Sequence, residues 1–197
     1  MSGARDRGAR PAVFLDRDGT LNREVHYLRA VRDLRLLPGA AEGLRRLGRA
    51  GFALVVVTNQ SAIARGLVGA RGVDAIHDEL RRRLARRGAA LDAIYVCPHH
   101  PEWTGRCRCR KPAPGLARRA ARDLHLDLAA SYCVGDSAGD LGLAGAIGVP
   151  AVLVLSGHGR HTARALAPAI PAAHVATSFR TAAEWIIHDA RRRRRGR

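Results

Sequence analysis

Apolar and polar positions along this chain alternate between short continuous hydrophobic runs and longer stretches in which hydrophobic residues recur every few positions. Short continuous apolar runs are typical of strands that are buried on both faces. Such runs cover residues 12–16, 53–58, 93–96, 131–135 and 151–155, and a shorter run at residues 175–176 predicts an edge strand.

The amphipathic stretches between these runs predict helices. In residues 73–87, for example, Ile76, Leu80 and Leu84 fall on one helical face. The other predicted helices cover residues 38–51, 114–124, 140–147 and 179–190. Because strands and helices alternate regularly, the pattern predicts an α/β fold with a doubly wound parallel sheet.

The length of 197 residues suits a single domain of ordinary size. We expect residues 1–11 to form a flexible N-terminus and residues 12–190 to form one domain. The arginine run that follows predicts a disordered tail over residues 191–197. The segments after the first and third strands are too short to hold a separate cap domain, so a site at this sheet should be open.

The composition indicates a cytoplasmic protein. Apolar residues make up 47% of the chain, but no run approaches the ~18 residues that a membrane span needs. Residues 1–10 are polar and basic, with no apolar segment before a cleavage site, so a secretory signal is not expected. The four cysteines are then expected to be reduced or bound to metal.

The formal net charge of +17 raises the question of nucleic-acid binding. The predicted tail contributes six of these charges and residues 1–11 contribute two, which leaves nine on the predicted domain. Because the arginines there are scattered along helices, a solvated surface is favoured over a nucleic-acid interface. Lys111 is the only lysine among 34 basic residues, which indicates a position that needs a compact ammonium group.

Acidic residues follow two of the apolar runs. Asp16 and Asp18 end the first run, and Asp136 and Asp140 follow the run at residues 131–135. Ligands bind at the carboxyl ends of parallel strands, and paired buried carboxylates are costly unless they hold a cation or react. A catalytic or metal site is therefore predicted, although Asp136 and Asp140 could instead cap the next helix.

Four segments resemble, in the same order, the signature motifs of the haloacid dehalogenase superfamily of phosphatases. They are Asp16-Arg17-Asp18-Gly19-Thr20, Thr58-Asn59-Gln60, Arg110-Lys111-Pro112, and Gly135-Asp136-Ser137-Ala138-Gly139-Asp140. Each motif alone is weakly specific, but four in the right order make a specific match.

This resemblance implies a two-step phosphatase mechanism. Asp16 would be the nucleophile that forms an aspartyl-phosphate, and Asp18 would be the general acid and base. Mg²⁺ would bind to Asp16, to the backbone carbonyl of Asp18 and to Asp136. Asp140 would lie in or near the layer of residues that surrounds these metal ligands. The phosphoryl oxygens would contact Thr58, Asn59 and Lys111.

Cys97-Pro98-His99 and Cys107-Arg108-Cys109 form a second group of chemically active residues. Three thiols and one imidazole at this spacing predict a structural zinc site in a loop at residues 97–109, because a disulfide is disfavoured in the cytoplasm. His100 is the alternative imidazole ligand, and Cys133 is expected to be a core residue. Histidines without ligand spacing are expected on the surface: His77, His125, His158 and His161.

The predicted zinc loop narrows the resemblance from the whole superfamily to one family within it. Residues 59–66 and 97–101 resemble the D-glycero-D-manno-heptose 1,7-bisphosphate 7-phosphatases, which use Mg²⁺ and carry Zn²⁺. The resemblance implies a sugar phosphate substrate in nucleotide-heptose synthesis, with contacts from Asn22, Asn59, Gln60, Ser61, Arg65 and Arg110. Ser137 departs from this family, which usually has a lysine there, so the rate and the substrate preference stay open.

Other functions also stay open. Histidinol-phosphate phosphatases share the zinc loop and the first motif, whereas nucleic-acid 3′-phosphatases share the other three motifs without the loop. A basic binding protein on an inactive phosphatase scaffold is the alternative outside the enzymes. The intact acidic residues and Lys111 disfavour it, and the open site suggests a monomer.

Overall fold

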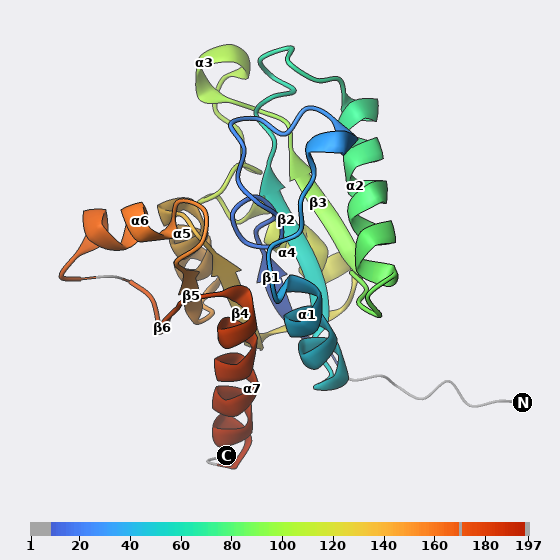
Figure 1. Cartoon of the computed structure of the whole chain (residues 1–197). Helices are drawn as coiled ribbons and strands as arrows, with labels where there is room; N and C mark the ends of the chain where they lie inside the picture. Colours follow the sequence, from blue (N-terminus) through green and yellow to red (C-terminus); the bar gives the residue numbers. More distant parts are fainter. Residues whose placement is uncertain (1–8, 170, 196–197) are drawn as a thin grey trace, which may run out of the picture.

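The computed structural model describes residues 9–169 and 171–195 and contains one parallel sheet (Figure 1). Its strands are β1 (Arg10–Leu15), β2 (Ala53–Asn59), β3 (Ala93–Cys97), β4 (Leu126–Gly135), β5 (Ala151–Val154) and β6 (His174–Ala176). Their spatial order is β3-β2-β1-β4-β5-β6, and every neighbouring pair is parallel. The first strand of the chain therefore lies in the middle of the sheet.

Helices cover both faces of this sheet. They are α1 (Ala40–Arg49), α2 (Ala70–Ala85), α3 (Pro101–Thr104), α4 (Gly115–Asp123), α5 (Ala138–Ile147), α6 (Gly159–Leu166) and α7 (Phe179–Arg195), with a 3-10 turn η1 (Val31–Asp33). Alternate residues of β1 enter two separate hydrophobic cores, one shared with α1, α2 and α7 and the other with α4 and α5. This arrangement confirms the predicted doubly wound α/β fold.

The strand register brings the polar ends of three strands together. Leu15, the last residue of β1, pairs with Val56 of β2 and with Val134 of β4. The backbone N–H of Asp16 then donates to the carbonyl of Val134 at 2.9 Å. Residues that follow these strands consequently meet at one edge of the sheet. Between β1 and β4 the chain changes the direction in which it adds strands, and ligands in such folds usually bind at this point.

Neither connection that could hold a cap domain forms one in the part of the chain described. Between β1 and β2 the chain contains only η1 and α1, and between β3 and α4 it contains only α3. The described helices include none that is long and apolar enough to span a membrane.

Several boundaries differ from those predicted. β1 begins at Arg10, inside the segment predicted as a flexible N-terminus, and α6 and α3 were not expected. The prediction of a disordered tail is wrong for residues 191–195, which continue α7, because Arg192 and Arg193 pair with the buried Asp189 one turn earlier. Residues 1–8 and 196–197 of the predicted termini lie outside the described residues.

Candidate active site

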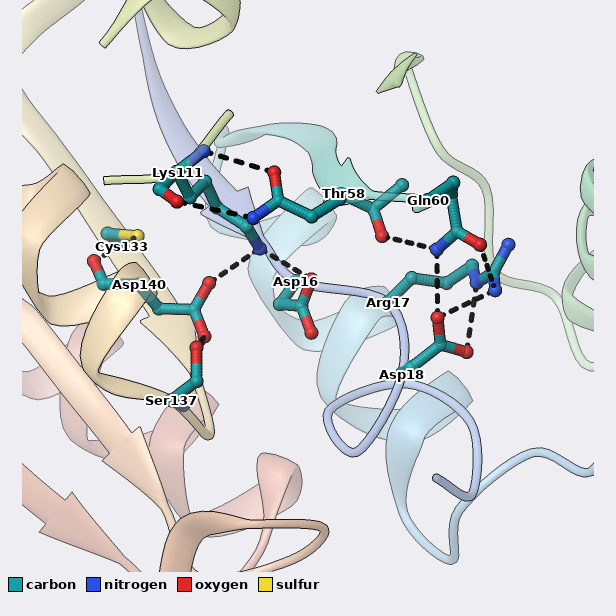
Figure 2. A network of polar contacts seen from close by, with 10 residues as sticks. Asp16, Arg17, Asp18, Thr58, Gln60, Lys111, Cys133, Ser137 and Asp140 are labelled. Carbon is teal, nitrogen blue, oxygen red and sulfur yellow. Dashed lines mark hydrogen bonds and ion pairs between the residues drawn. The ribbon is translucent and has the colours of Figure 1, made fainter. Parts of the chain in front are cut away.

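The predicted nucleophile and the only lysine of the chain are in direct contact. Lys111, which precedes α4, places its Nζ 2.5 Å from Asp16 Oδ1 and 2.6 Å from Asp140 Oδ1 (Figure 2). The Lys111 side chain is almost fully buried, and the two carboxylates raise the pKa of its ammonium group above the usual value although burial opposes this. Lys111 is therefore a fixed positive charge beside Asp16.

The loop that presents Lys111 is fastened to the end of β2. The backbone N–H of Lys111 donates to Asn59 Oδ1 at 3.0 Å, and Asn59 Nδ2 donates to the Lys111 carbonyl at 3.3 Å. This reciprocal pair occupies the amide of Asn59, which the sequence assigned to phosphate or substrate contact. The structure gives Asn59 a clear role in holding the lysine loop, and its contact with substrate stays a prediction.

Asp136 follows β4 and occupies a space that two glycines leave open. A Cβ at Gly19 would lie 2.0 Å from Asp136 Oδ2, and a Cβ at Gly157 would lie 2.1 Å from the same oxygen. Both glycines also have positive φ angles, of 79° and 52°. The backbone N–H of His158 donates to Asp136 Oδ2 at 2.7 Å, so the carboxylate is held at the sheet edge by surrounding backbone.

Oxygen atoms of Asp16, Asp136 and Asp140 lie within 4.8 Å of one another, close enough to surround one cation. Burial raises the pKa of Asp16 to about 7 against the opposing charge of Lys111, and burial raises that of Asp136 to about 7 as well. Clustered, dehydrated carboxylates of this kind favour a bound divalent cation. The donor set fits Mg²⁺, and the contribution of the Asp18 carbonyl stays a prediction.

Asp140 has a second function in this cluster. It is the third residue of α5, and its Oδ2 accepts hydrogen bonds from the backbone N–H and hydroxyl of Ser137, at 3.0 and 2.6 Å. This is the capping interaction that the sequence left open as an alternative. Because Oδ1 of Asp140 accepts from Lys111, the residue both caps α5 and orients the lysine. Ser137, which the sequence marked as a departure from the family it resembles, serves as the cap residue.

We predict that Mg²⁺ binding weakens as the pH falls through 7. Because the raised pKa values keep Asp16 and Asp136 largely protonated below pH 7, the metal must displace protons there, whereas both groups are ionised above it. The apparent Kd for Mg²⁺, measured from thermal shifts, is expected to be ~10–100-fold weaker at pH 6 than at pH 8. Asp136→Asn should flatten this dependence; equal affinities of the unaltered protein at both values would contradict it.

Asp18, the predicted general acid and base, is turned toward a different set of partners (Figure 2). Arg17 donates to both of its oxygens, from Nε to Oδ1 at 3.1 Å and from Nη2 to Oδ2 at 2.6 Å. Asn22 and Gln60 donate to the same two oxygens at 2.8 and 2.9 Å. Although burial opposes ionisation, these donors lower the pKa of Asp18. Arg17 is fully buried and was not singled out from the sequence.

The residues at the end of β2 are linked to this group. Gln60 Nε2 also donates to Thr58 Oγ1 at 2.8 Å, while Gln60 Oε1 accepts from Arg17. Gln60 thus connects the predicted phosphate-binding hydroxyl with the predicted general acid. Its amide is buried and engaged on both sides, so its assigned contact with substrate stays a prediction.

A pocket of about 300 Å³ opens above these residues. Most residues assigned to catalysis or substrate line it: Asp16, Asp18, Thr58, Asn59, Gln60, Ser61, Arg110, Lys111 and Asp136. Asn22 and Arg65 are not part of this lining; Asn22 is fully buried behind Asp18, and the Arg65 guanidinium lies 3.7 Å from the centre of the exposed Trp103 ring. The pocket wall also includes Glu24, which the sequence did not reveal. Burial and the nearby acidic residues raise its pKa to about 7.

The predicted zinc ligands form a compact cluster beside this pocket. Sγ of Cys109 lies 3.2 Å from Cys97 Sγ and 3.4 Å from Cys107 Sγ, and His99 Nδ1 is 3.2 Å from Cys109 Sγ. All four donor atoms lie within 4.8 Å of one another, close to the edges of a tetrahedron with metal–sulfur bonds of about 2.3 Å. The three thiols are free, so the donor set fits zinc.

The histidine predictions are only partly correct. His100, the alternative zinc ligand, instead caps α3 through a hydrogen bond that its ring accepts from the backbone of Glu102. The surface assignment holds for His125, His158 and His161 but is wrong for His77. His77 lies on the inner face of α2, is only 6% exposed and contacts Arg17. Cys133 is buried in the core as predicted.

Comparison with known proteins places the chain among phosphatases. Residues 108–182 match the HAD-hydrolase-like family model. The D-glycero-β-D-manno-heptose-1,7-bisphosphate 7-phosphatase of Yersinia pestis is 44% identical over 154 residues, which are 75% of this chain and 81% of that protein. The protein of the same name from Escherichia coli K12 is 40% identical over 91% of this chain and 89% of its own length.

A solved structure agrees with these relatives. The D,D-heptose 1,7-bisphosphate phosphatase of B. bronchiseptica, in complex with magnesium and phosphate, superposes with a TM-score of 0.83. It is 37% identical, and the match covers 91% of this chain and 99% of that one. Together with the aspartate cluster, Lys111 and the Cys/His cluster at one sheet edge, these matches establish that the chain belongs to the heptose-bisphosphate phosphatase family of HAD-type phosphatases.

Proposed function

We propose that this protein removes the 7-phosphate of D-glycero-D-manno-heptose 1,7-bisphosphate in the cytoplasm, in nucleotide-heptose synthesis. The observation that carries the proposal is a pocket that places Asp16 beside Lys111 in a chain related to such enzymes over most of its length. Arg110 on the wall of the same pocket provides a planar cation suited to a second phosphate or to sugar hydroxyls.

The reaction begins with attack by a carboxylate oxygen of Asp16 on the phosphorus atom. A bond forms between that oxygen and phosphorus, and the bond from phosphorus to the sugar oxygen breaks. Asp18, whose lowered pKa favours the ionised form, must first take up a proton; it gives this proton to the departing sugar oxygen and becomes a carboxylate again. The Lys111 ammonium group offsets the negative charge on the phosphoryl oxygens, and the Thr58 hydroxyl donates a hydrogen bond to them.

In the second step Asp18 takes a proton from a water molecule, which attacks the aspartyl-phosphate and releases inorganic phosphate. Asp16 is then restored. Mg²⁺, held by Asp16, Asp136 and the backbone at Asp18, supplies further neutralisation of the phosphoryl charge when it is bound. Asp140 keeps the Lys111 ammonium in place through both steps.

The proposal predicts a strong preference for one substrate class. Phosphate release with Mg²⁺ would be measured for both anomers of heptose 1,7-bisphosphate, histidinol phosphate, fructose 1,6-bisphosphate and an oligonucleotide with a 3′-phosphate. One heptose anomer is expected to have a kcat/KM at least ~10²-fold above the others, because a fitted polar site discriminates strongly.

A preference for histidinol phosphate or for the oligonucleotide would contradict the heptose assignment. A flat profile would do the same, and would point to Ser137 or the zinc loop as the origin of an altered specificity. Gel filtration of the same preparation tests the proposed monomer.

A further inference from the structure

Every acceptor direction of Asp18 is occupied by a donor, and half of these bonds come from one side chain. Arg17 donates to both oxygens of the carboxylate, from Nε and from Nη2. Its own side chain is fully buried, whereas that of Asp18 is 18% exposed toward the pocket. The position of Asp18 therefore depends on where the Arg17 guanidinium lies.

The Arg17 guanidinium is in turn fixed from its far side by α2. Its Nη1 donates to Nε2 of His77 at 2.9 Å, and its Nη2 also donates to Gln60 Oε1 at 3.0 Å. Because an arginine can only donate, Nε2 of His77 must be the acceptor, and the ring is neutral. Burial and the neighbouring Arg17 charge lower the pKa of His77 to about 4, which agrees with a neutral ring.

His77 has no contact with the pocket, the aspartate cluster or the zinc loop among the hydrogen bonds of the described residues. It is a buried polar residue on the face of α2 that packs on the sheet, where neighbouring positions are Val73, Ile76 and Leu80. A buried imidazole there is costly unless its polar atoms are used. The contact with Arg17 is the use that the structure shows.

We propose that His77 and Arg17 are positioning residues that hold the Asp18 carboxyl group in place for proton transfer to the leaving oxygen. The inference rests on the phosphatase chemistry above but not on the identity of the sugar. The structure shows the ionised form of Asp18, with a donor at each acceptor direction. The protonated form that acts as the acid must release one of these donors, and when its proton passes to the leaving oxygen, the carboxylate that forms is the species that Arg17, Asn22 and Gln60 stabilise. α2 thereby connects to the first chemical step through two buried side chains.

The test compares leaving groups. An alkyl phosphate releases an alkoxide that needs a proton, whereas p-nitrophenyl phosphate releases a stable anion that does not. Since kcat/KM reports steps up to departure of the leaving group, it isolates the step in which Asp18 is the acid. The alkyl probe is the best sugar phosphate of the substrate panel, and each variant is compared with the unaltered protein.

His77→Leu removes the acceptor at similar volume and is expected to lower kcat/KM for the alkyl phosphate by ~10–100-fold, a part of the ~10²–10⁴-fold that a general acid contributes. The value for p-nitrophenyl phosphate should change less than ~3-fold. His77→Gln, whose amide oxygen can accept from Arg17, should restore most of the loss. Ile76→Val, a conservative change at a buried apolar neighbour that offers no hydrogen bond, should affect both substrates equally.

Equal losses on both substrates would assign His77 a structural role and overturn the proposal, as would unchanged or increased turnover of the alkyl phosphate. If His77→Leu does not fold, His77→Asn gives the same comparison, because its shorter amide stays polar but does not reach Arg17. Failure of the heptose assignment would appear in the substrate panel and would leave this comparison of leaving groups intact.

Discussion

Asp16→Asn is expected to abolish phosphate release, with a loss of at least ~10⁴-fold in kcat on every substrate of the panel. The amide has almost the same shape as the carboxylate but is a poor nucleophile, so the aspartyl-phosphate does not form. Folding should be retained or improved, because the substitution removes one of three clustered carboxylates while Lys111 keeps its contact with Asp140. Turnover with Mg²⁺ and thermal unfolding measure the two effects.

The matched variant is Asp18→Asn, which leaves the nucleophile in place. With p-nitrophenyl phosphate it should still release p-nitrophenolate in a first turnover and then stall, because the water that attacks the aspartyl-phosphate lacks its base. Acid quenching should recover phosphorylated protein from Asp18→Asn and none from Asp16→Asn. An active Asp16→Asn variant, or a phosphoryl group on another residue, would exclude the covalent mechanism proposed here.

Loss of the zinc site should have the largest effect on stability. The four ligands lie on both sides of α3 and close a loop that has little core of its own. Cys109→Ser is expected to remove about one zinc per chain and to cost at least ~3 kcal/mol of unfolding free energy. For a chain of this size that corresponds to a drop of roughly 6–12 °C in Tm.

The same substitution should lower activity, because the loop leads directly into the catalytic lysine. Arg110 Nη1 donates to the His99 carbonyl at 3.2 Å, and Gly115 at the start of α4 donates to the Arg108 carbonyl at 3.1 Å. Cys133→Ala provides the control, since that thiol is buried elsewhere and should leave the zinc content unchanged. Metal analysis combined with thermal unfolding tests whether the zinc site stabilises the fold. A zinc-free protein of unchanged Tm would show that the site is not structural.

The sequence revealed the strands and the site residues that follow them, because both depend on local patterns. A buried strand is a continuous apolar run, and an acid directly after it must lie at the sheet edge. Asp16 and Asp136 could therefore be placed together from the sequence, and the family resemblance added Lys111 at the start of the following helix. The four zinc ligands were found for a similar reason, since their spacing in one short loop fixes their proximity.

The residues missed by the sequence act across long separations. Arg17 occupies the variable position of its motif, and His77 is one polar residue among many on α2, so nothing local shows that the two face each other over 60 positions. The prediction of a disordered tail failed because it considered the repulsion among the arginines but not their acidic partner. Asp189 is buried one turn earlier and pairs with two of the arginines. Arginine also has a high helix propensity.

The central position of β1 has a consequence for how the molecule is made. β1 is the first strand of the chain, yet it needs β4 as a neighbour, and the Ala12 amide is bound by Ser131, 119 positions later. Until the ribosome has released β4, one edge of β1 is left without its native partner, and Asp16 lacks Asp136, which follows β4. Contacts of such long range make folding slow. The nucleophile is thus among the first side chains synthesised and among the last to reach a working environment.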